Sequence, residues 1–188
     1  MPPSGKVLVF AGSARSGSFN KKLAAYGAKA LTAAGADVTL IDLADYPAAI
    51  YNGDYEDATG MPGSMRELKT LIASHDAVMI STPEYNGCVP PLLVNVLSWT
   101  SRPDGDKPNA PVFRNKPVAI MATSPGGRGG IRVIPRLRDC LAEVGAMVIP
   151  GFATVAGAAK AFDEDGALIG EHEANAVTDL AERLVAAI

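Results

Sequence analysis

The sequence predicts an α/β protein built on a doubly wound parallel sheet, and three observations carry that prediction. Five short runs of mostly apolar, β-branched residues are typical of strands that are buried on both faces. Segments with apolar or alanine residues at helical spacing lie between these runs. Parallel strands need such crossover connections, because each strand must start again from the same edge of the sheet.

The predicted elements alternate along the chain. Strands are predicted at 6–11, 37–42, 76–81, 117–123 and 147–149. Helices are predicted at 20–34, 64–74, 91–99, 131–144 and 171–187. Two connections are long for this architecture, 43–63 with three tyrosines and 101–116 with proline and charge. We expect lids or subunit contacts there, or alternatively solvated surface insertions.

The size and composition of the chain favour a single domain that acts on small molecules. Its 188 residues, 48% of them hydrophobic, suit one domain spanning 1–188. The 17 Lys and Arg residues are scattered and the net charge is −3, which argues against a nucleic-acid or membrane-surface partner. No apolar run approaches the roughly 18 residues of a membrane helix. No signal-peptide profile opens the chain, so we expect a cytoplasmic protein.

The loop between the first strand and the first helix reads Ala-Gly-Ser-Ala-Arg-Ser-Gly-Ser-Phe-Asn over residues 11–20. A loop that enters a helix N-terminus exposes unpaired N–H groups at the positive end of the helix dipole, so we expect an anion there. A Walker phosphate loop would need lysine after Gly17, where Ser18 stands. A dinucleotide-binding turn would need glycine in place of Ala14. The loop therefore matches neither of these motifs.

The side chains of this loop favour one terminal phosphate. The hydroxyls of Ser13 and Ser18 and the amide of Asn20 would surround it. Arg15 offers bidentate, charge-assisted hydrogen bonds that neutralise a dianion without a metal ion. The alternative is a helix cap made by serine and asparagine, with the arginine on the surface.

The loop after the third strand adds a second part of the predicted site. It reads Ser-Thr-Pro-Glu-Tyr-Asn-Gly-Cys-Val-Pro-Pro over residues 81–91. In a doubly wound sheet the first and third strands flank the topological switch point, where ligands bind. This second loop offers an aromatic ring, amide groups and a glycine that a flat ligand can approach. Facing a phosphate loop, it predicts flavin mononucleotide (FMN).

Both loops resemble signatures of the NADPH-dependent FMN reductase family, whose chromate and quinone reductases are the nearest likeness. Gly-Ser-Ala-Arg-Ser-Gly-Ser-Phe-Asn (12–20) resembles the first signature, and Pro-Glu-Tyr-Asn-Gly-Cys-Val-Pro (83–90) resembles the second. The likeness extends through Leu-Ser-Trp-Thr-Ser-Arg-Pro (97–103) and Thr-Ser-Pro-Gly-Gly-Arg-Gly-Gly (123–130). It implies a flavodoxin-like, five-stranded sheet in the order 2-1-3-4-5 with helices on both faces.

The resemblance also implies roles for individual residues. Those that would hold the FMN phosphate are Ser13, Arg15, Ser18 and Asn20. Those that would flank the isoalloxazine ring are Pro83, Glu84, Tyr85, Asn86 and Gly87. Ser124 and Gly126 would line the opposite wall, with an ordinary strand-to-helix turn as the alternative. Tyr85 and Arg128 are possible substrate contacts, although Arg128 is equally well explained as a solvated loop charge. No metal site is implied.

The implied activity is oxidation of NADPH or NADH through bound FMN. Electrons would pass on to a quinone, an azo compound, a chromate-like oxyanion or free flavin in a ping-pong cycle. A flavodoxin-type electron carrier is one alternative, and a nucleotide-sensing or scaffold module without turnover is another. Members of the family are usually dimers or tetramers, which implies a homodimer or homotetramer with the 43–63 connection at an interface.

The remaining reactive and aromatic side chains have simpler predicted roles. Cys88 stands where the family commonly has serine or another small residue, and its thiol is either redox-active or a small buried hydrophobe. Cys140 and Trp99 are predicted to pack in the core. We assign structural roles to His75 and His172, whose spacing predicts no metal site.

Overall fold

Six parallel strands form one sheet. They are β1 (Lys6–Ala11), β2 (Asp37–Ile41), β3 (Ala77–Thr82), β4 (Pro117–Thr123), β5 (Met147–Val148) and β6 (Ala153–Val155). The order is β2-β1-β3-β4-β5, and β6 also pairs with β4. The computed structural model describes residues 5–104 and 111–188. It confirms the predicted strand order, and the bounds of β1 and β4 are those that the sequence predicted.

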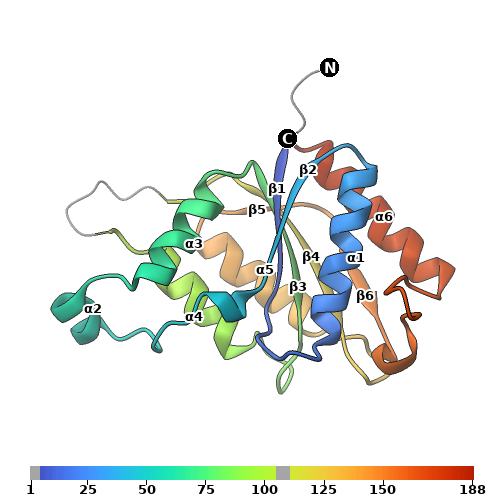
Figure 1. Ribbon diagram of the computed structural model, residues 1–188, viewed down its shortest axis with the longest axis horizontal. Coiled ribbons are helices and arrows are strands. Elements are labelled where there is room, and N and C mark those ends of the chain that lie inside the picture. Colours follow the sequence, from blue (N-terminus) through green and yellow to red (C-terminus); the bar gives the residue numbers. More distant parts are fainter. Residues whose placement is uncertain (1–4, 105–110) are drawn as a thin grey trace.

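Helices cover both faces of the sheet (Figure 1). One face carries α1 (Phe19–Ala33) and α6 (Glu171–Val185); the other carries α3 (Gly63–Ala73), α4 (Pro91–Thr100) and α5 (Val133–Glu143). Side chains alternate along a strand, so Val7 and Val9 of β1 pack toward α1 and α6. Leu8 and Phe10 pack into the other layer. Within the described ranges, no helix is long and apolar enough to cross a membrane.

The fifth strand position is split into two short pieces. β5 pairs with the beginning of β4, where Met147 lies opposite Pro117. β6 pairs with the end of β4, where Ala153 lies opposite Met121. Between them Gly151 adopts a φ of +90°, which breaks the strand. The sequence predicted only the first piece, because a three-residue strand beside this break carries too short an apolar pattern to be recognised.

The first of the two long connections contains helical segments that the sequence did not predict. A 3₁₀ turn spans Leu43–Asp45, and a helix, α2, spans Gly53–Thr59. None of the α2 residues is buried, so this segment lacks the apolar stripe by which a helix is recognised. In Figure 1, α2 lies at the far edge of the molecule, beyond α3 and α4. Of the 101–116 connection, residues 105–110 lie outside the described part of the chain.

Trp99 anchors the first of these connections, which confirms its predicted packing role. Its side chain is fully buried, and its indole N–H donates to the Ala49 carbonyl over 2.9 Å. The rings of Tyr51 and Tyr55 lie edge-on to it, with centroid distances of 5.0 and 6.1 Å. The aromatic residues of the connection therefore pack partly against the α3/α4 layer rather than being wholly solvated.

Helix α1 approaches the sheet closely at Gly27. A Cβ atom at this position would lie 2.7 Å from Met121 Cε and 2.8 Å from Met79 Sδ. Both methionines are fully buried, so the helix backbone rests directly on their side chains. This contact holds α1, and with it the loop at its N-terminus, in a defined place over the sheet.

Candidate functional site

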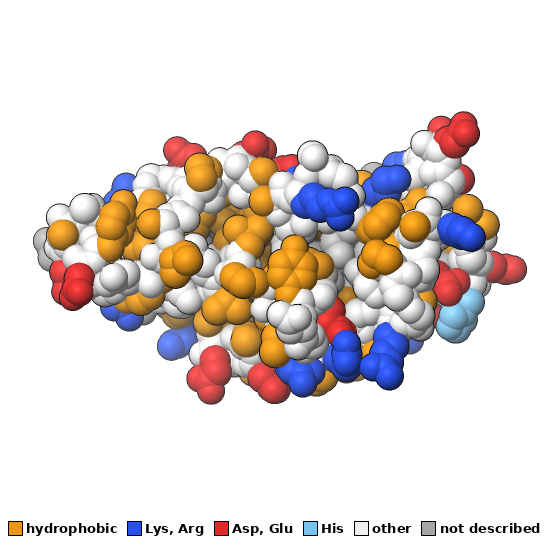
Figure 2. Space-filling view, turned by 90° about the horizontal axis from the view of Figure 1, so that it is seen from below, with side chains coloured by type: hydrophobic (Ala, Val, Ile, Leu, Met, Phe, Trp, Pro, Cys, Tyr) orange, Lys and Arg blue, Asp and Glu red, His pale blue; other side chains and the backbone are white. Residues whose placement is uncertain are grey.

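Three loops meet at the carboxyl edge of the sheet. They span residues 12–18, 83–90 and 124–132, and they follow the adjacent strands β1, β3 and β4. The Gly12 N–H donates to the Ser81 carbonyl over 2.8 Å, which ties the first loop to β3. Figure 2 looks onto this edge and shows basic side chains on both sides of a central apolar area. The two loops that carry the predicted phosphate and ring contacts thus stand next to each other at the switch point.

The first loop offers hydrogen-bond donors that have no protein acceptor. Among the residues that the structure describes, the backbone N–H groups of 13–17 donate to no other group. Ser13 and Ser18 are only 6% and 5% exposed, yet within the same described ranges neither hydroxyl is hydrogen-bonded. Ser18 is the N-cap residue of α1, but its side chain makes no capping bond. A serine helix cap, the alternative interpretation of this loop, is therefore not what the structure shows.

Arg15 adds a positive charge to these donors. Its guanidinium is exposed and, in the described part of the chain, makes neither an ion pair nor a hydrogen bond. The N-terminus of α1 follows directly and contributes the positive end of its dipole. Unpaired N–H groups, two hydroxyls and a guanidinium together form a donor set that suits a phosphate dianion.

Asn20 has a scaffold role in addition to the predicted contact with phosphate. Its side-chain oxygen accepts the Ser81 hydroxyl (3.0 Å) and the Thr123 N–H (3.1 Å). Its side-chain nitrogen donates to the Thr123 carbonyl over 3.0 Å, and the residue is 4% exposed. The amide therefore clips α1 to the ends of β3 and β4. One of its two N–H groups remains for a ligand.

Residues 85–88 of the second loop form a tight hairpin turn. Tyr85 and Cys88 exchange backbone hydrogen bonds of 3.1 and 2.8 Å, and Asn86 and Gly87 between them have φ values of +53° and +77°. Left-handed values at both central residues are typical of a type I′ turn. Over the described ranges, the N–H groups of Asn86 and Gly87 donate to no protein atom. Tyr85 is 50% exposed, and Cys88 is exposed rather than the buried hydrophobe that was one of its two predicted roles.

The side chain of Glu84 is engaged by the third loop. Its carboxylate accepts hydrogen bonds from the backbone N–H of Arg132 (3.0 Å) and from Arg132 Nε (2.8 Å), and it forms an ion pair with the guanidinium, whose Nη2 lies 2.5 Å from Oε1. The preceding Pro83 is half-buried, and its carbonyl accepts the Thr82 hydroxyl over 3.0 Å. Any contact of Glu84 with the flavin ring is thus left to its backbone, because the carboxylate already has its partners.

The backbone of the third loop is bound to β6. The Ser124 N–H donates to the Val155 carbonyl over 3.3 Å. Gly129 has a φ of +58°, and a Cβ atom there would lie 3.0 Å from both the Ala156 nitrogen and the Val155 carbonyl carbon. Glycine at this position therefore serves the close approach of β6, a role that the sequence did not predict.

The exposed part of the third loop carries the remaining predicted contacts. Gly126 is exposed, and the only atom near a Cβ placed on it is Ser124 Oγ at 4.0 Å. Arg128 is also exposed and has no ion pair or hydrogen bond with any described residue. It is the second unpaired guanidinium of this edge, after Arg15.

Comparison with known proteins identifies the family. A model described as NADPH-dependent FMN reductase matches residues 5–160. This chain belongs to the NADPH-dependent FMN reductase family. It is 35% identical over 168 residues to an NAD(P)H-dependent FMN reductase of Pseudomonas aeruginosa, covering 88% of this chain and 85% of that protein. It is 37% identical over 144 residues to a quinone reductase of Escherichia coli K12, covering 77% of this chain and 73% of that protein.

A solved structure extends the comparison to the whole fold. FerB, a flavoenzyme NAD(P)H:(acceptor) oxidoreductase of Paracoccus denitrificans, matches this FMN reductase with a TM-score of 0.78 at 30% identity. The match covers 97% of this chain and 96% of that one. The protein is therefore an NAD(P)H-dependent oxidoreductase whose cofactor is FMN. The unpaired donors of the first loop fit the phosphate group of that cofactor, and the unpaired N–H groups of the second fit the polar edge of its ring.

An ion pair supports the first loop of this FMN reductase from the β2 side. Lys21 Nζ lies 2.5 Å from Asp42 Oδ2 and 3.3 Å from the Ala14 carbonyl. Burial raises the pKa of Asp42. Hydrogen bonds from Lys21 and from the Ala44 N–H, together with the lysine charge, lower it by more, so the pKa lies below its ordinary value. The two residues of this pair and Tyr46 line a cavity of about 450 Å³. Lys21 is thus neutralised by Asp42, whereas Arg15 has no ion pair with any residue that the structure describes.

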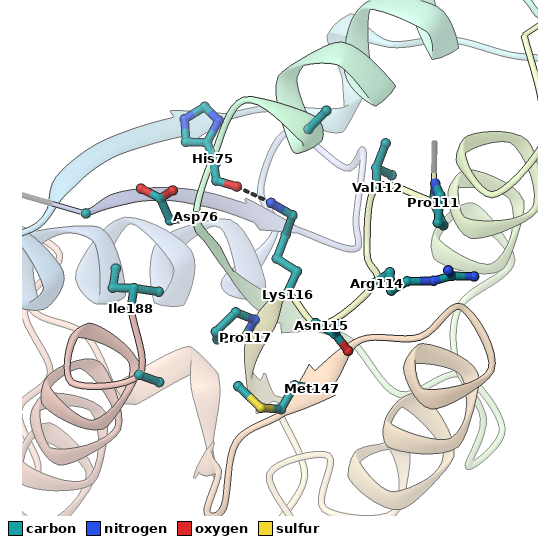
Figure 3. Close-up of a pocket in the computed structure, with 13 residues that line it drawn as sticks. His75, Asp76, Pro111, Val112, Arg114, Asn115, Lys116, Pro117, Met147 and Ile188 are labelled. Carbon is teal, nitrogen blue, oxygen red and sulfur yellow. Dashed lines mark hydrogen bonds between the residues drawn. The ribbon is translucent and has the colours of Figure 1, made fainter. Parts of the chain in front are cut away.

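A cavity of about 740 Å³ opens at the opposite, amino edge of the sheet (Figure 3). Three of the polar residues that line it, His75, Asp76 and Lys116, are hydrogen-bonded to other parts of the chain. The ring nitrogens of His75, which is 6% exposed, contact the Leu71 carbonyl at 2.7 Å and the Thr39 hydroxyl at 2.8 Å. Lys116 donates to the His75 carbonyl; burial lowers the pKa of Lys116, and the Asp76 charge partly offsets that shift. These contacts confirm the structural role predicted for His75.

Sequence reasoning missed three residues that shape the carboxyl edge, namely Ser81, Thr123 and Arg132. Ser81 and Thr123 close two buried apolar runs, and a polar residue at the carboxyl end of such a run is a signal that could have found them. No local pattern marks Arg132, because its partner is 48 positions away. Within residues 5–104 and 111–188, no group of three or more His, Cys, Asp or Glu side chains could hold a metal ion.

Proposed function

We propose that this enzyme holds FMN at the carboxyl edge of the sheet, oxidises NAD(P)H there and reduces quinones. The observation that carries the proposal is a set of donors with no acceptor among the described residues: the N–H groups of 13–17, the Ser13 and Ser18 hydroxyls and the Arg15 guanidinium. The groups that would hold the phosphate are the loop N–H groups and the side chains of Ser13, Arg15, Ser18 and Asn20. The ring would lie against residues 83–87, with Ser124 and Gly126 on the opposite wall.

Bound FMN supplies the redox chemistry, accepting a hydride from nicotinamide and giving two electrons to the acceptor. The chain positions and polarises the ring. The N–H groups of Asn86 and Gly87 have no acceptor among the described residues, and they would donate to the polar edge of the ring as negative charge develops there. Tyr85, half exposed, would border the face at which the substrates bind.

We further propose that one open face serves both substrates in turn, so that the cycle is ping-pong. Arg128, exposed and unpaired among the described residues, would meet an anionic group of the donor or the acceptor. Quinones come first among the acceptors because a relative at 37% identity is named a quinone reductase. Azo compounds, chromate-like oxyanions and free flavin are the further acceptors to compare. Parallel initial-rate lines at several quinone concentrations are expected, and intersecting lines would exclude the ping-pong cycle.

The decisive experiment is an anaerobic titration of the FMN-reconstituted protein with NADPH and then with NADH, followed by addition of a quinone. We expect the flavin absorbance to bleach with at least one nicotinamide and to return with the quinone. Flavin that bleaches only with a one-electron reductant would instead indicate a flavodoxin-type carrier. Failure to retain FMN would overturn the assignment of residues 12–20 and leave a module without turnover.

We also propose that the enzyme is a homodimer or homotetramer with the 43–63 connection at an interface. Helix α2 buries none of its residues within the chain. Ile50, just before this helix, is 84% exposed, and Tyr55, within it, is 42% exposed, which leaves apolar surface for a second copy to cover. Sedimentation at working concentration should show a multiple of 19.4 kDa. A particle of the single-chain mass alone would contradict this proposal.

A further inference from the structure

An ion pair joins the second and third loops across the carboxyl edge. The Glu84 carboxylate accepts two hydrogen bonds from Arg132, one from its backbone N–H at Oε2 and one from Nε at Oε1, and Nη2 also lies 2.5 Å from Oε1. The Glu84 side chain is 8% exposed, whereas that of Arg132 is 52% exposed. Because both carboxylate oxygens are engaged by one residue through charge-assisted contacts, the relative orientation of the two groups is fixed as well as their distance. The pair is therefore a directional connection between the two loops.

The same ion pair lies at the N-terminus of helix α5. Arg132 is the N-cap residue of α5, and its own side chain makes no capping hydrogen bond. The carboxylate that accepts its N–H comes from another loop and lies at the positive end of the helix dipole. Gly130, two residues earlier, has a φ of +81°, and a Cβ atom there would lie 3.1 Å from Ala122 Cβ, so glycine allows the third loop to pass close to β4. The second loop is thus attached to a rigid element of the scaffold.

The hairpin has no other attachment of this kind. Within the described residues, the hydrogen bonds that join residues 84–89 to any segment outside the loop are those between Glu84 and Arg132. The bonds between Tyr85 and Cys88 close the turn on itself but do not place it relative to the sheet. The position of the Asn86–Gly87 N–H groups is therefore set largely through Glu84.

We propose that Arg132 is a positioning residue for the flavin reaction: through Glu84 it sets where the N–H groups of Asn86 and Gly87 stand against the ring. This inference rests on the proposed function, because it presupposes a ring beside the second loop. Donors placed at the ring edge stabilise the reduced, more negative flavin more than the oxidised one. Release of the loop lowers that preference and makes the bound flavin harder to reduce.

The test measures the midpoint potential of bound FMN and the steady-state kinetics for Arg132→Ala, Glu84→Gln and the double variant. Glu84→Gln keeps the size of the side chain and an oxygen for the Arg132 N–H, so it is the variant that preserves folding best. Arg136→Ala is the matched control, since it removes a nearby exposed charge of the same helix that has no carboxylate partner in the described chain.

We expect both single variants to shift the potential to more negative values and to lower kcat by about tenfold with little change in KM for NAD(P)H. The double variant should be no worse than the single ones, because all three remove the same ion pair between the guanidinium and the carboxylate. Arg136→Ala should match the parent. Unchanged potential and kcat in both single variants, or fully additive effects, would overturn the inference.

A second measurement separates this inference from the proposed function. Hydrogen exchange of the peptide 83–90 is followed in the protein without added FMN, for the parent, Arg132→Ala and Arg136→Ala. Faster exchange only in Arg132→Ala supports the connection even if the parent does not retain FMN, in which case the proposed function alone fails. Equal exchange in all three proteins counts against the connection itself, whatever the fate of the flavin.

Discussion

The polar groups at the two edges of the parallel sheet differ in whether they are hydrogen-bonded within the chain. At the amino edge, His75, Asp76 and Lys116 border a cavity of about 740 Å³, and each is hydrogen-bonded to another part of the chain. At the carboxyl edge, Arg15 and the N–H groups of residues 13–17 have no partner among the described residues. We therefore base the proposed site on a concentration of unsatisfied donors and not on the size of a cavity.

The direction of the chain explains this asymmetry. Every strand of the sheet runs the same way, so helix N-termini gather near the carboxyl edge and helix C-termini near the amino edge. N–H groups are left over at the first edge and carbonyl groups at the second. The carbonyls at the amino edge find donors in long side chains, as the carbonyl of His75 does in Lys116. The N–H groups at the carboxyl edge remain available for an anion.

The largest expected effect is on the free energy of unfolding, and it comes from a substitution at Gly129 in the third loop of the carboxyl edge. Gly129→Ala adds a methyl group at a φ of +58° against backbone atoms 3.0 Å away, and we expect a loss of about 3 kcal/mol in the free energy of unfolding. Gly157→Ala is the matched control, since its φ is +59° but no atom lies within 4 Å of the added methyl. It should lose about 1 kcal/mol, from backbone strain alone. Equal losses in urea unfolding would contradict the close approach of β6.

The next largest effect is on FMN affinity, and it is tested by removing one arginine from each edge of the sheet. Arg15→Ala should weaken FMN binding by about 1.5–3 kcal/mol, because the dianion loses a charge-assisted bidentate contact. Arg114→Ala removes an exposed arginine that lines the amino-edge cavity and should leave FMN affinity unchanged. Fluorescence titration of FMN with each protein measures both values. Equal affinities for the two variants would place the phosphate elsewhere.

The converse experiment disrupts the amino edge. His75→Phe keeps a buried ring but removes the bonds to the Leu71 carbonyl and the Thr39 hydroxyl, and it should lower the free energy of unfolding by about 1–2 kcal/mol. FMN affinity should stay at the parent value, because the carboxyl edge is untouched. A variant of parent stability but weakened FMN binding would reverse the roles assigned to the two edges.

The smallest effect concerns pH and Asp42. Its folded pKa lies below the ordinary value of 3.8, so the ionised side chain stabilises the fold above that pH, and this stabilisation is lost as the pH falls through the folded pKa. Both partners are partly solvated, so Asp42→Asn should cost only about 0.3 kcal/mol at pH 6. The gap between variant and parent in urea unfolding should close below pH 3.8. A gap that is constant over this range would mean that the charge contributes nothing.

The strand framework, and the meeting of the two candidate loops at one edge of the sheet, could be predicted from the sequence. The apolar runs of β1 and β4 mark their own bounds, and the order of parallel strands puts the loops after β1 and β3 at one edge. Helix α2 could not be predicted, because it buries no residue and so has no apolar stripe. The partner of Glu84 could not be predicted either, because tertiary packing alone brings Arg132 to it.

The tight turn of the second loop carries a cysteine to which a fluorescent label can be attached. Cys88 presents an exposed thiol at this turn, whereas Cys140 is partly buried, and burial together with the Asp139 charge raises the pKa of the Cys140 thiol. These are the two cysteines of the chain. A maleimide dye at neutral pH should therefore attach first at Cys88. The enzyme thus carries a natural labelling point from which the movement of its second loop during turnover can be followed by fluorescence.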